Sequence, residues 1–209
     1  MIEGIRVFDT VLDVKRNDTV SRNAADFWSP FCKSAGWKFG YERVHSLTDL
    51  EYFLSKKINE NVIIFSGHGL GNLKGGKVGF HLTNGDVLDG SSNIKIHKEN
   101  HGKIIIFSAC LIGSNEALCK GLGKLFDAEF LFAYRHEVYD RFCFLNESIL
   151  LTYIEHSTKS GDAKFNHAKF EEFRKQTMFM KNMNKEHVKL HPMRMLALMT
   201  GTGKFEEWS

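Results

Sequence analysis

Two short runs of consecutive apolar residues stand out in the hydrophobic pattern of this chain. They span residues 62–65, with the sequence VIIF, and residues 104–107, with the sequence IIIF. Neither run alternates between apolar and polar positions, and both consist of β-branched and aromatic residues. Such runs are typical of strands buried on both faces, as in a parallel sheet covered by helices. The pattern therefore predicts two neighbouring strands inside such a sheet.

The remaining hydrophobic pattern predicts further strands and helices in alternation. Shorter apolar or alternating stretches predict strands within residues 2–14 and over residues 37–44, 78–82, 87–88, 130–134 and 190–201. Apolar residues spaced three and four apart predict helices over residues 19–35, 47–58, 114–126, 142–154 and 163–176. This order indicates an α/β fold, a three-layer αβα sandwich with a mainly parallel central sheet, which we expect to form a single domain over residues 1–209.

A few residues predict where these elements begin and end. Pro30 should kink or end the first helix early, and Gly36 should stop it. Ser46 or Thr48 can cap the second helix. The sequence Asn84-Gly85-Asp86 between two apolar stretches is a strong hairpin signal, and this hairpin should project from the edge of the sheet.

Composition and charge exclude several classes of protein. The chain is 43% hydrophobic and 25% charged with two prolines, as in ordinary globular proteins, and no apolar run approaches the roughly 18 residues of a membrane span. Acidic residues within the first 20 positions argue against a signal peptide, so we expect a cytoplasmic protein. The net charge of +3 is dispersed, which argues against direct binding of nucleic acid. The four cysteines form no CxxC pair and should be free thiols.

Reactive residues follow the two buried runs. The first run leads into Ser66-Gly67-His68-Gly69, and the second leads into Ser108-Ala109-Cys110. If the strands are parallel neighbours, His68 and Cys110 leave the sheet at the same carboxyl edge, where α/β sheets bind ligands. A cysteine beside a histidine can form an activated thiolate nucleophile. The other three cysteines, Cys32, Cys119 and Cys143, lie in apolar helical patterns and are expected to be inert.

These two strand ends resemble the caspase-like clan (clan CD) of cysteine peptidases, most closely its CHAT branch. The resemblance rests on Ser66-Gly67-His68-Gly69 and on Ser108-Ala109-Cys110 with Gly113 just after it. It extends over roughly residues 60–203, because Asp140 follows a predicted strand as in CHAT chains, and His191-Pro192 before an apolar strand and Gly201 is similar to the CHAT C-terminus.

The resemblance implies a thiol protease, with Cys110 as nucleophile and His68 as general acid and base. The backbone amides of Gly69 and Cys110 would form the oxyanion hole, and glycine suits position 69 because no Cβ would block the substrate. A thiol with the reference pKa of about 8.5 is only slightly ionised near neutrality, so the site must favour the thiolate. The helix expected from Ser114 should help by presenting its positive end to Cys110. No metal or organic cofactor is required.

The resemblance also bears on specificity and partners. Asp140 is the position similar to the acidic specificity residue of related peptidases, with Glu137 as the nearby substitute, which implies cleavage after a basic residue. Asp140 could instead only cap the following helix, and Arg135 in the pocket would select an acidic residue. CHAT relatives are commonly controlled by attached or separate sensor modules and are often associated with tetratricopeptide repeats. For this chain the resemblance therefore implies an effector, as in antiviral defence, with a protein substrate and an activating sensor protein, such as a tetratricopeptide-repeat partner.

Other readings of the sequence remain open. The chain could be a catalytically silent CHAT-like module that acts by binding. It could also be a nucleotide-binding α/β domain, because the glycines and lysine of residues 71–77 match a phosphate-binding loop, but Val78 replaces the residue that would bind magnesium. The pairs His97 and His101, and His187 and His191, have metal-ligand spacing but no evident acidic third ligand, and solvated histidines are the simpler interpretation.

Overall fold

The structure is a computed structural model of the 209-residue chain. It describes residues 2–11, 24–71, 77–135, 137–138, 140–159, 195–199 and 204–208. The helix expected over residues 163–176, His187 and the pair His191-Pro192 lie outside these ranges. All statements below concern the described residues.

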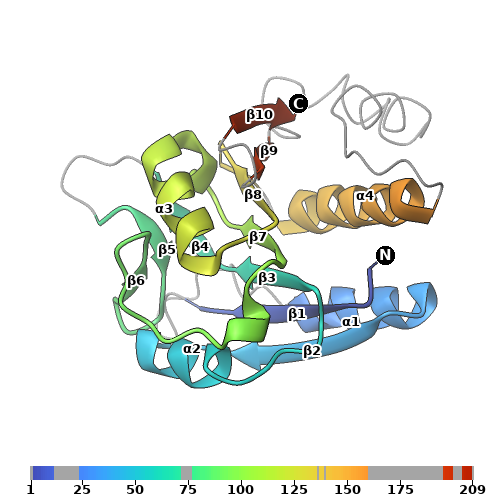
Figure 1. The fold of residues 1–209 in the computed structure, drawn as a ribbon, viewed down its shortest axis with the longest axis horizontal. Coiled ribbons are helices and arrows are strands. Elements are labelled where there is room, and N and C mark those ends of the chain that lie inside the picture. Colours follow the sequence, from blue (N-terminus) through green and yellow to red (C-terminus); the bar gives the residue numbers. More distant parts are fainter. Residues whose placement is uncertain are drawn as a thin grey trace.

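A seven-stranded sheet forms the centre of the molecule, in the order β10-β9-β8-β7-β3-β1-β2 (Figure 1). Its strands are β1 (Gly4–Asp9), β2 (Lys38–Arg43), β3 (Val62–Ser66), β7 (Ile104–Ser108), β8 (Phe130–Tyr134), β9 (Met195–Met199) and β10 (Lys204–Trp208). The pairings from β2 to β8 are parallel, and β9 and β10 add antiparallel pairs. The predicted mainly parallel sheet is confirmed, whereas β10 was not predicted.

Helices cover both faces of the sheet, which makes the predicted three-layer arrangement. The helices are α1 (Ala24–Ala35), α2 (Leu47–Leu54), α3 (Glu116–Phe126) and α4 (Asp140–Lys159). Buried residues of α1 and α4 pack against one face and those of α2 and α3 against the other (Figure 1). The chain adds β2 on one side of β1 and β3 on the other, so the strand order reverses between β1 and β3. Ligands of α/β sheets bind outside the carboxyl ends of strands at such a point.

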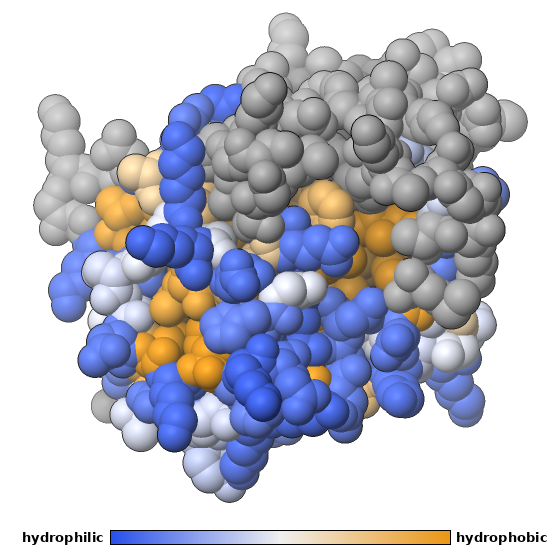
Figure 2. Space-filling view, in the orientation of Figure 1, coloured by the Kyte–Doolittle hydropathy of each residue, from blue (hydrophilic) through white to orange (hydrophobic). Residues whose placement is uncertain are grey.

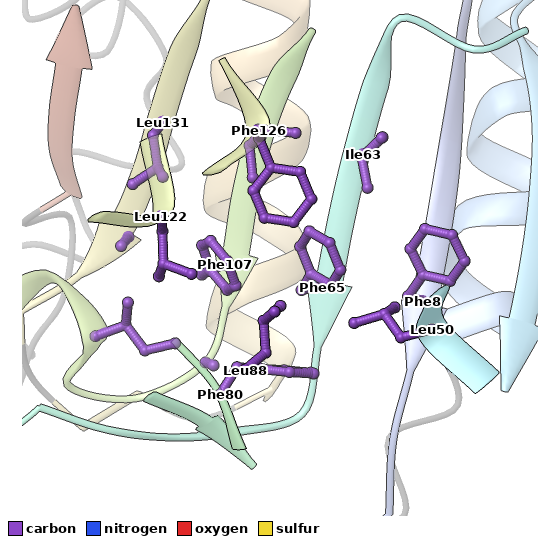
Figure 3. Packing of buried hydrophobic residues seen from close by; sticks show 14 of the residues in the cluster. Phe8, Leu50, Ile63, Phe65, Phe80, Leu88, Phe107, Leu122, Phe126 and Leu131 are labelled. Atoms are coloured by element: carbon purple, nitrogen blue, oxygen red, sulfur yellow. The ribbon is translucent and has the colours of Figure 1, made fainter. Parts of the chain in front are cut away.

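Aromatic rings fill the layer between the sheet and the helices α2 and α3. The ring of Phe65 in β3 stacks on Phe107 in β7 with 4.9 Å between centroids, and it also lies 5.3 Å from Phe126 of α3 (Figure 3). Alternate residues of these strands, such as Ile64 and Ile106, are buried on the opposite face. The two apolar runs are therefore buried on both faces, as their sequence predicts.

Packing and a glycine determine where helix α1 ends. Helix α1 passes through Pro30 and continues to Ala35, so the expectation of an early end was wrong. Trp28 and Cys32 on either side of the proline are fully buried, and this packing holds the helix together although Pro30 has no N–H to donate. Gly36, with φ +75°, ends α1 as predicted.

A smaller three-stranded antiparallel sheet follows β3 in the chain. It consists of β4 (His68–Leu70), β5 (Gly79–His81) and β6 (Val87–Leu88), and the predicted hairpin is its β5–β6 pair. The ring of Phe80 is fully buried, 5.8 Å from Phe65 and 6.0 Å from Phe107. This contact holds the small sheet against the carboxyl half of the central sheet, so the hairpin packs on the core instead of projecting freely (Figure 3).

The described surface is mixed in polarity. On the face seen in Figure 2, hydrophilic residues separate the hydrophobic ones into groups. Tyr52, with a relative exposure of 58%, is the one exposed large hydrophobic residue in the described ranges, and the ammonium of Lys56 lies 3.5 Å from its ring centroid. None of the helices described is both long and apolar enough to cross a membrane.

Candidate active site

The carboxyl ends of β3 and β7 lie side by side. The strands are parallel neighbours in register, with Ser66 opposite Ser108. The N–H of Gly67 donates to the carbonyl of Ser108 at 3.2 Å. The two segments therefore stay together beyond the last residue of β3. His68 and Cys110 each come two residues after this register pair. The predicted meeting of the two strand ends is confirmed.

The strand that begins at His68 packs closely on the turn that begins at Cys110. A Cβ added at Gly69 would collide with the carbonyl oxygen of Cys110 and would lie 2.6 Å from the side chain of Ile112. The side-chain amide of Asn115 donates to the carbonyl of Gly71 at 3.1 Å. Glycine is needed at position 69 because the Cys110 carbonyl occupies the space of a side chain. The other expected reason, unobstructed approach of a substrate, stays a prediction.

The backbone next to Cys110 is strained. Leu111 has φ +63° and ψ −7°, a left-handed conformation that costs a bulky L-residue about 1–2 kcal/mol. Hydrogen bonds hold it there: the N–H of Ile112 donates to the carbonyl of Cys110 at 2.8 Å, and the hydroxyl of Ser114 donates to the carbonyl of Leu111 at 2.6 Å. Strain of this kind is concentrated at functional sites.

Helix α3 begins later than its sequence suggested. A 3₁₀ turn, η2 (Ile112–Ser114), lies between Cys110 and α3. The N-cap of α3 is Asn115, whose side chain accepts from the N–H of Leu118 at 2.9 Å. The expected helix start at Ser114 was wrong because the Ser114 hydroxyl bonds to Leu111 instead of capping the helix. The effect of a helix dipole falls off within one turn. The expected help of the amino end of α3 in favouring the thiolate stays a prediction.

Cys110 differs from the other three cysteines in its exposure. It is partly exposed, whereas Cys32, Cys119 and Cys143 are buried, and all four are free thiols. Burial raises the pKa of Cys119 to about 12 and that of Cys32 to about 12, so both stay protonated at neutral pH. This confirms the prediction of free thiols and leaves Cys110 as the accessible one.

The Cys110 sulfur lies against the segment between β8 and α4. The N–H of Val138 donates to Sγ at 3.3 Å, and Sγ lies 3.6 Å from the carbonyl oxygen of Val138, to which the thiol can donate. The three residues expected to control specificity belong to this part of the chain. Arg135 is partly exposed, Glu137 is exposed, and Asp140 is the first residue of α4, with its side chain outside the description. Their roles stay predictions.

His68 has a second histidine as its neighbour. It is partly exposed and lies directly opposite His81 in the antiparallel β4–β5 pair, so the two side chains share one face of the small sheet. The ring Nε2 of His81 lies 2.9 Å from the carbonyl oxygen of Lys77. This pairing could not be predicted from the sequence, because only the register between β4 and β5 brings position 81 to position 68.

A buried polar cluster lies at the same edge, at the ends of β1 and β2. The carboxylate of Asp9 is fully buried and accepts from the Tyr41 hydroxyl at 2.8 Å and from the Arg43 guanidinium at 3.2 Å. Burial and the adjacent Asp9 raise the pKa of Tyr41. Beside Asp9, the hydroxyl of Ser66 is buried with no hydrogen-bond partner among the described atoms. Sequence reasoning missed Asp9, although a polar residue ending an apolar strand was the available signal.

The alternative ligand sites receive no support from the described residues. No group of three or more His, Cys, Asp or Glu that could hold a metal occurs in the described ranges. His97 caps the 3₁₀ helix η1 (Lys98–Asn100), and Nδ1 of His101 lies 3.1 Å from the carbonyl oxygen of Phe126. Most of the glycine-rich stretch 71–77 lies outside the described ranges.

Compared with protein-family models and with curated proteins, the chain shows no significant match to either.

Proposed function

We propose that this chain is a caspase-like cysteine endopeptidase, with Cys110 as nucleophile and His68 as general acid and base. The observation that carries the proposal is the adjoining ends of β3 and β7, where an accessible thiol and a histidine follow the same register pair. The strained backbone after Cys110 adds support, because strain of this kind is concentrated at functional sites. The free thiols suit a reducing, cytoplasmic environment.

The chemistry assigns each proton and bond. His68 takes the proton of the Cys110 thiol, and the sulfur attacks the carbonyl carbon of the scissile peptide. The N–H groups of Gly69 and Cys110 stabilise the oxyanion, and the C–N bond breaks as His68 returns the proton to the leaving amine. A water molecule, activated by His68, then hydrolyses the thioester and releases the acid product. No metal or organic cofactor takes part.

Labelling with a peptide-based thiol inhibitor tests the proposal. The purified chain is incubated with an acyloxymethyl ketone peptide, with and without candidate partner proteins, and the modified cysteine is identified by mass spectrometry. Modification of Cys110 that requires His68 is the expected result. Cys119 provides the control, since it is fully buried and should remain unmodified in the folded protein. Equal modification of both cysteines would contradict the proposal.

We further propose cleavage after a basic residue, selected by Asp140. A carboxylate can bind a substrate arginine through two hydrogen bonds, and a substrate of the wrong charge would leave it unpaired. Glu137 is the substitute acid, and Arg135 is the competing group that would favour acidic substrates. Peptides with Arg, Lys, Asp or Leu before the scissile bond decide between them. Asp140→Ala should reduce cleavage after Arg without preventing labelling of Cys110, and preference for Asp would reject the assignment.

We propose that a protein partner, of tetratricopeptide-repeat or other sensor type, activates the enzyme. The glycines at 67, 69, 71, 75, 76 and 79 give the segment around His68 a large conformational entropy that must be lost on ordering. Binding of a partner can offset this loss. Turnover should therefore be low for the isolated chain and rise with the partner or on assembly. Strong constitutive turnover by the purified monomer would contradict this part of the proposal.

A further inference from the structure

The Cys110 sulfur is held between two backbone groups of one residue. Val138 presents its N–H to Sγ at 3.3 Å and its carbonyl oxygen at 3.6 Å. These are the hydrogen bonds of the thiol within the described part of the chain. The side chain of Val138 is partly buried and packs against the core cluster between the sheet and the helices α1 and α4. Hydrophobic contact therefore fixes the position of this backbone relative to the sulfur.

The two backbone groups favour opposite protonation states of the sulfur. A neutral thiol can accept from the N–H and donate to the carbonyl, so both contacts are favourable. A thiolate can only accept, so it gains a charge-assisted hydrogen bond from the N–H and is repelled by the carbonyl oxygen. Removing the N–H should therefore make the sulfur less reactive, and removing the carbonyl contact should make it more reactive.

We propose that the N–H of Val138 is a positioning group that holds the Cys110 sulfur and stabilises it as a thiolate. The inference rests on the proposed function in taking Cys110 as the nucleophile. When His68 takes the thiol proton, the Val138 carbonyl loses its donor and faces an anion, so it turns away while the N–H bond shortens. The segment that carries Arg135 and Glu137 thereby moves with the charge on the nucleophile. A substrate bound to this segment would alter the reactivity of Cys110.

Alkylation by iodoacetamide measures the effect without a protein substrate. The rate at Cys110, followed by peptide mass spectrometry, is recorded at pH 7 and pH 10, and their ratio reports the fraction present as thiolate at pH 7. The ratio is needed because a more basic sulfur is also a better nucleophile, which partly masks a change in ionisation at one pH. Val138→Pro lacks the N–H and should lower the ratio roughly tenfold, in line with loss of one charge-assisted hydrogen bond. The conservative variant Val138→Ile keeps the N–H and should stay within about twofold of the wild-type ratio.

A second variant removes the donor without a proline. Replacing the peptide bond between Glu137 and Val138 by an ester exchanges the N–H for an oxygen and keeps the valine side chain. It should lower the ratio as Val138→Pro does, and an unchanged ratio in the folded ester protein would overturn the inference.

The proposed function is tested separately, since it fails if His68→Ala and wild type alkylate alike and no peptide is cleaved. The effect of Val138 on the ratio would stand in that case.

Discussion

The two edges of the central sheet use their polar residues differently. At the amino edge, where β1, β3 and β7 begin, polar groups are paired in a closed network. The ammonium of Lys103 is buried, where burial lowers its pKa, and it donates to the carbonyls of Ile58 and Glu60 at 3.0 and 2.7 Å. The guanidinium of Arg6 binds the Glu60 carboxylate at 3.2 Å. Each of these contacts joins segments distant in sequence, so this edge stabilises the fold.

At the carboxyl edge, Asp9 is paired with Tyr41 and Arg43, but the ends of β3 and β7 contain features that stabilise nothing locally. The Ser66 hydroxyl is buried without a described partner, Leu111 is in a left-handed conformation, and the Cys110 thiol is partly exposed. Such departures from local optimality are expected where a protein carries out its function. The comparison separates residues that hold the fold from residues available for chemistry, and variants at each edge can test the separation.

Cys110→Ala and His68→Ala should have the largest effect, and on activity alone. Each should lower peptide cleavage by at least about 10³-fold, because a dyad loses most of its rate when either member is removed. Both residues follow the strands and are partly exposed, so thermal unfolding should stay close to wild type. Cleavage of a fluorogenic peptide in the presence of an activating partner is the measurement. Full activity in Cys110→Ala would refute the mechanism.

Asn100→Ala should have the largest effect on stability. Asn100 is fully buried at the amino edge and bonds to the backbone of Leu54, Lys56 and Ile58 at 2.7–2.8 Å. Leaving these buried groups unsatisfied should lower the free energy of unfolding by about 3 kcal/mol, measured in urea.

The matched control for this variant is Asn93→Ala, because Asn93 is exposed. Its free energy of unfolding should lie within about 0.5 kcal/mol of wild type. Both asparagine variants should keep wild-type labelling of Cys110 under conditions where they are folded. A loss of labelling in folded Asn100→Ala would show that the two edges are coupled.

Gly69→Ala and Gly102→Ala compare one glycine from each edge. The added Cβ at position 69 would meet the Cys110 carbonyl, whereas at position 102, where φ is +71°, it would meet nothing within 4 Å. Gly69→Ala should displace the Cys110 turn, lower stability by about 2 kcal/mol and slow labelling roughly tenfold. Gly102→Ala should lower stability by about 1 kcal/mol through backbone strain and leave labelling unchanged. Equal labelling rates of Cys110 in Gly69→Ala and in the wild type would show that the Gly69 contact does not position Cys110.

Tyr41→Phe should have the smallest effect, visible as a pH dependence. The raised pKa of Tyr41 comes from burial and from Asp9, so its stabilising contribution is complete below the unfolded pKa of about 10 and is lost as pH rises through the higher folded pKa. Because Tyr41 is partly exposed, removing its hydroxyl should lower the free energy of unfolding by only about 0.5–1 kcal/mol at pH 8. The variant should also lose less stability than wild type above pH 10. Tyr52→Phe, at an exposed tyrosine, should retain the wild-type profile.

The sequence was sufficient for the parallel part of the sheet and for the meeting of its two reactive strand ends. Both follow from a short-range pattern, because unbroken apolar runs predict strands buried on both faces. The hairpin likewise follows from Asn84-Gly85. Strand β10 was missed because its sequence, KFEEW, is dominated by charge. Pro30 was expected to kink α1 or to end it early, and the early end did not occur because tertiary packing of α1 outweighed a local preference.

The detail of the site could not be predicted, because it depends on contacts between distant segments. Asp9 and His81 join the edge through strand register, and Val138 reaches Cys110 through a backbone contact that carries no side-chain signature. Ser114 and Asn115 are both good capping residues, and only the turn at Leu111 decides that Asn115 caps α3. The specificity residues stay predictions for the same reason.

The separation of His68 and Cys110 on neighbouring strands has a consequence for the newly made chain. Parallel neighbours require long connections, and pairings between distant segments form late in folding. Synthesis delivers β3 and the small sheet before β7 exists, so an unfinished chain holds the histidine without its nucleophile. Pairing of β7 with β3 is then the step that brings the proposed dyad together. An unfinished chain that ends before β7 therefore lacks the proposed nucleophile.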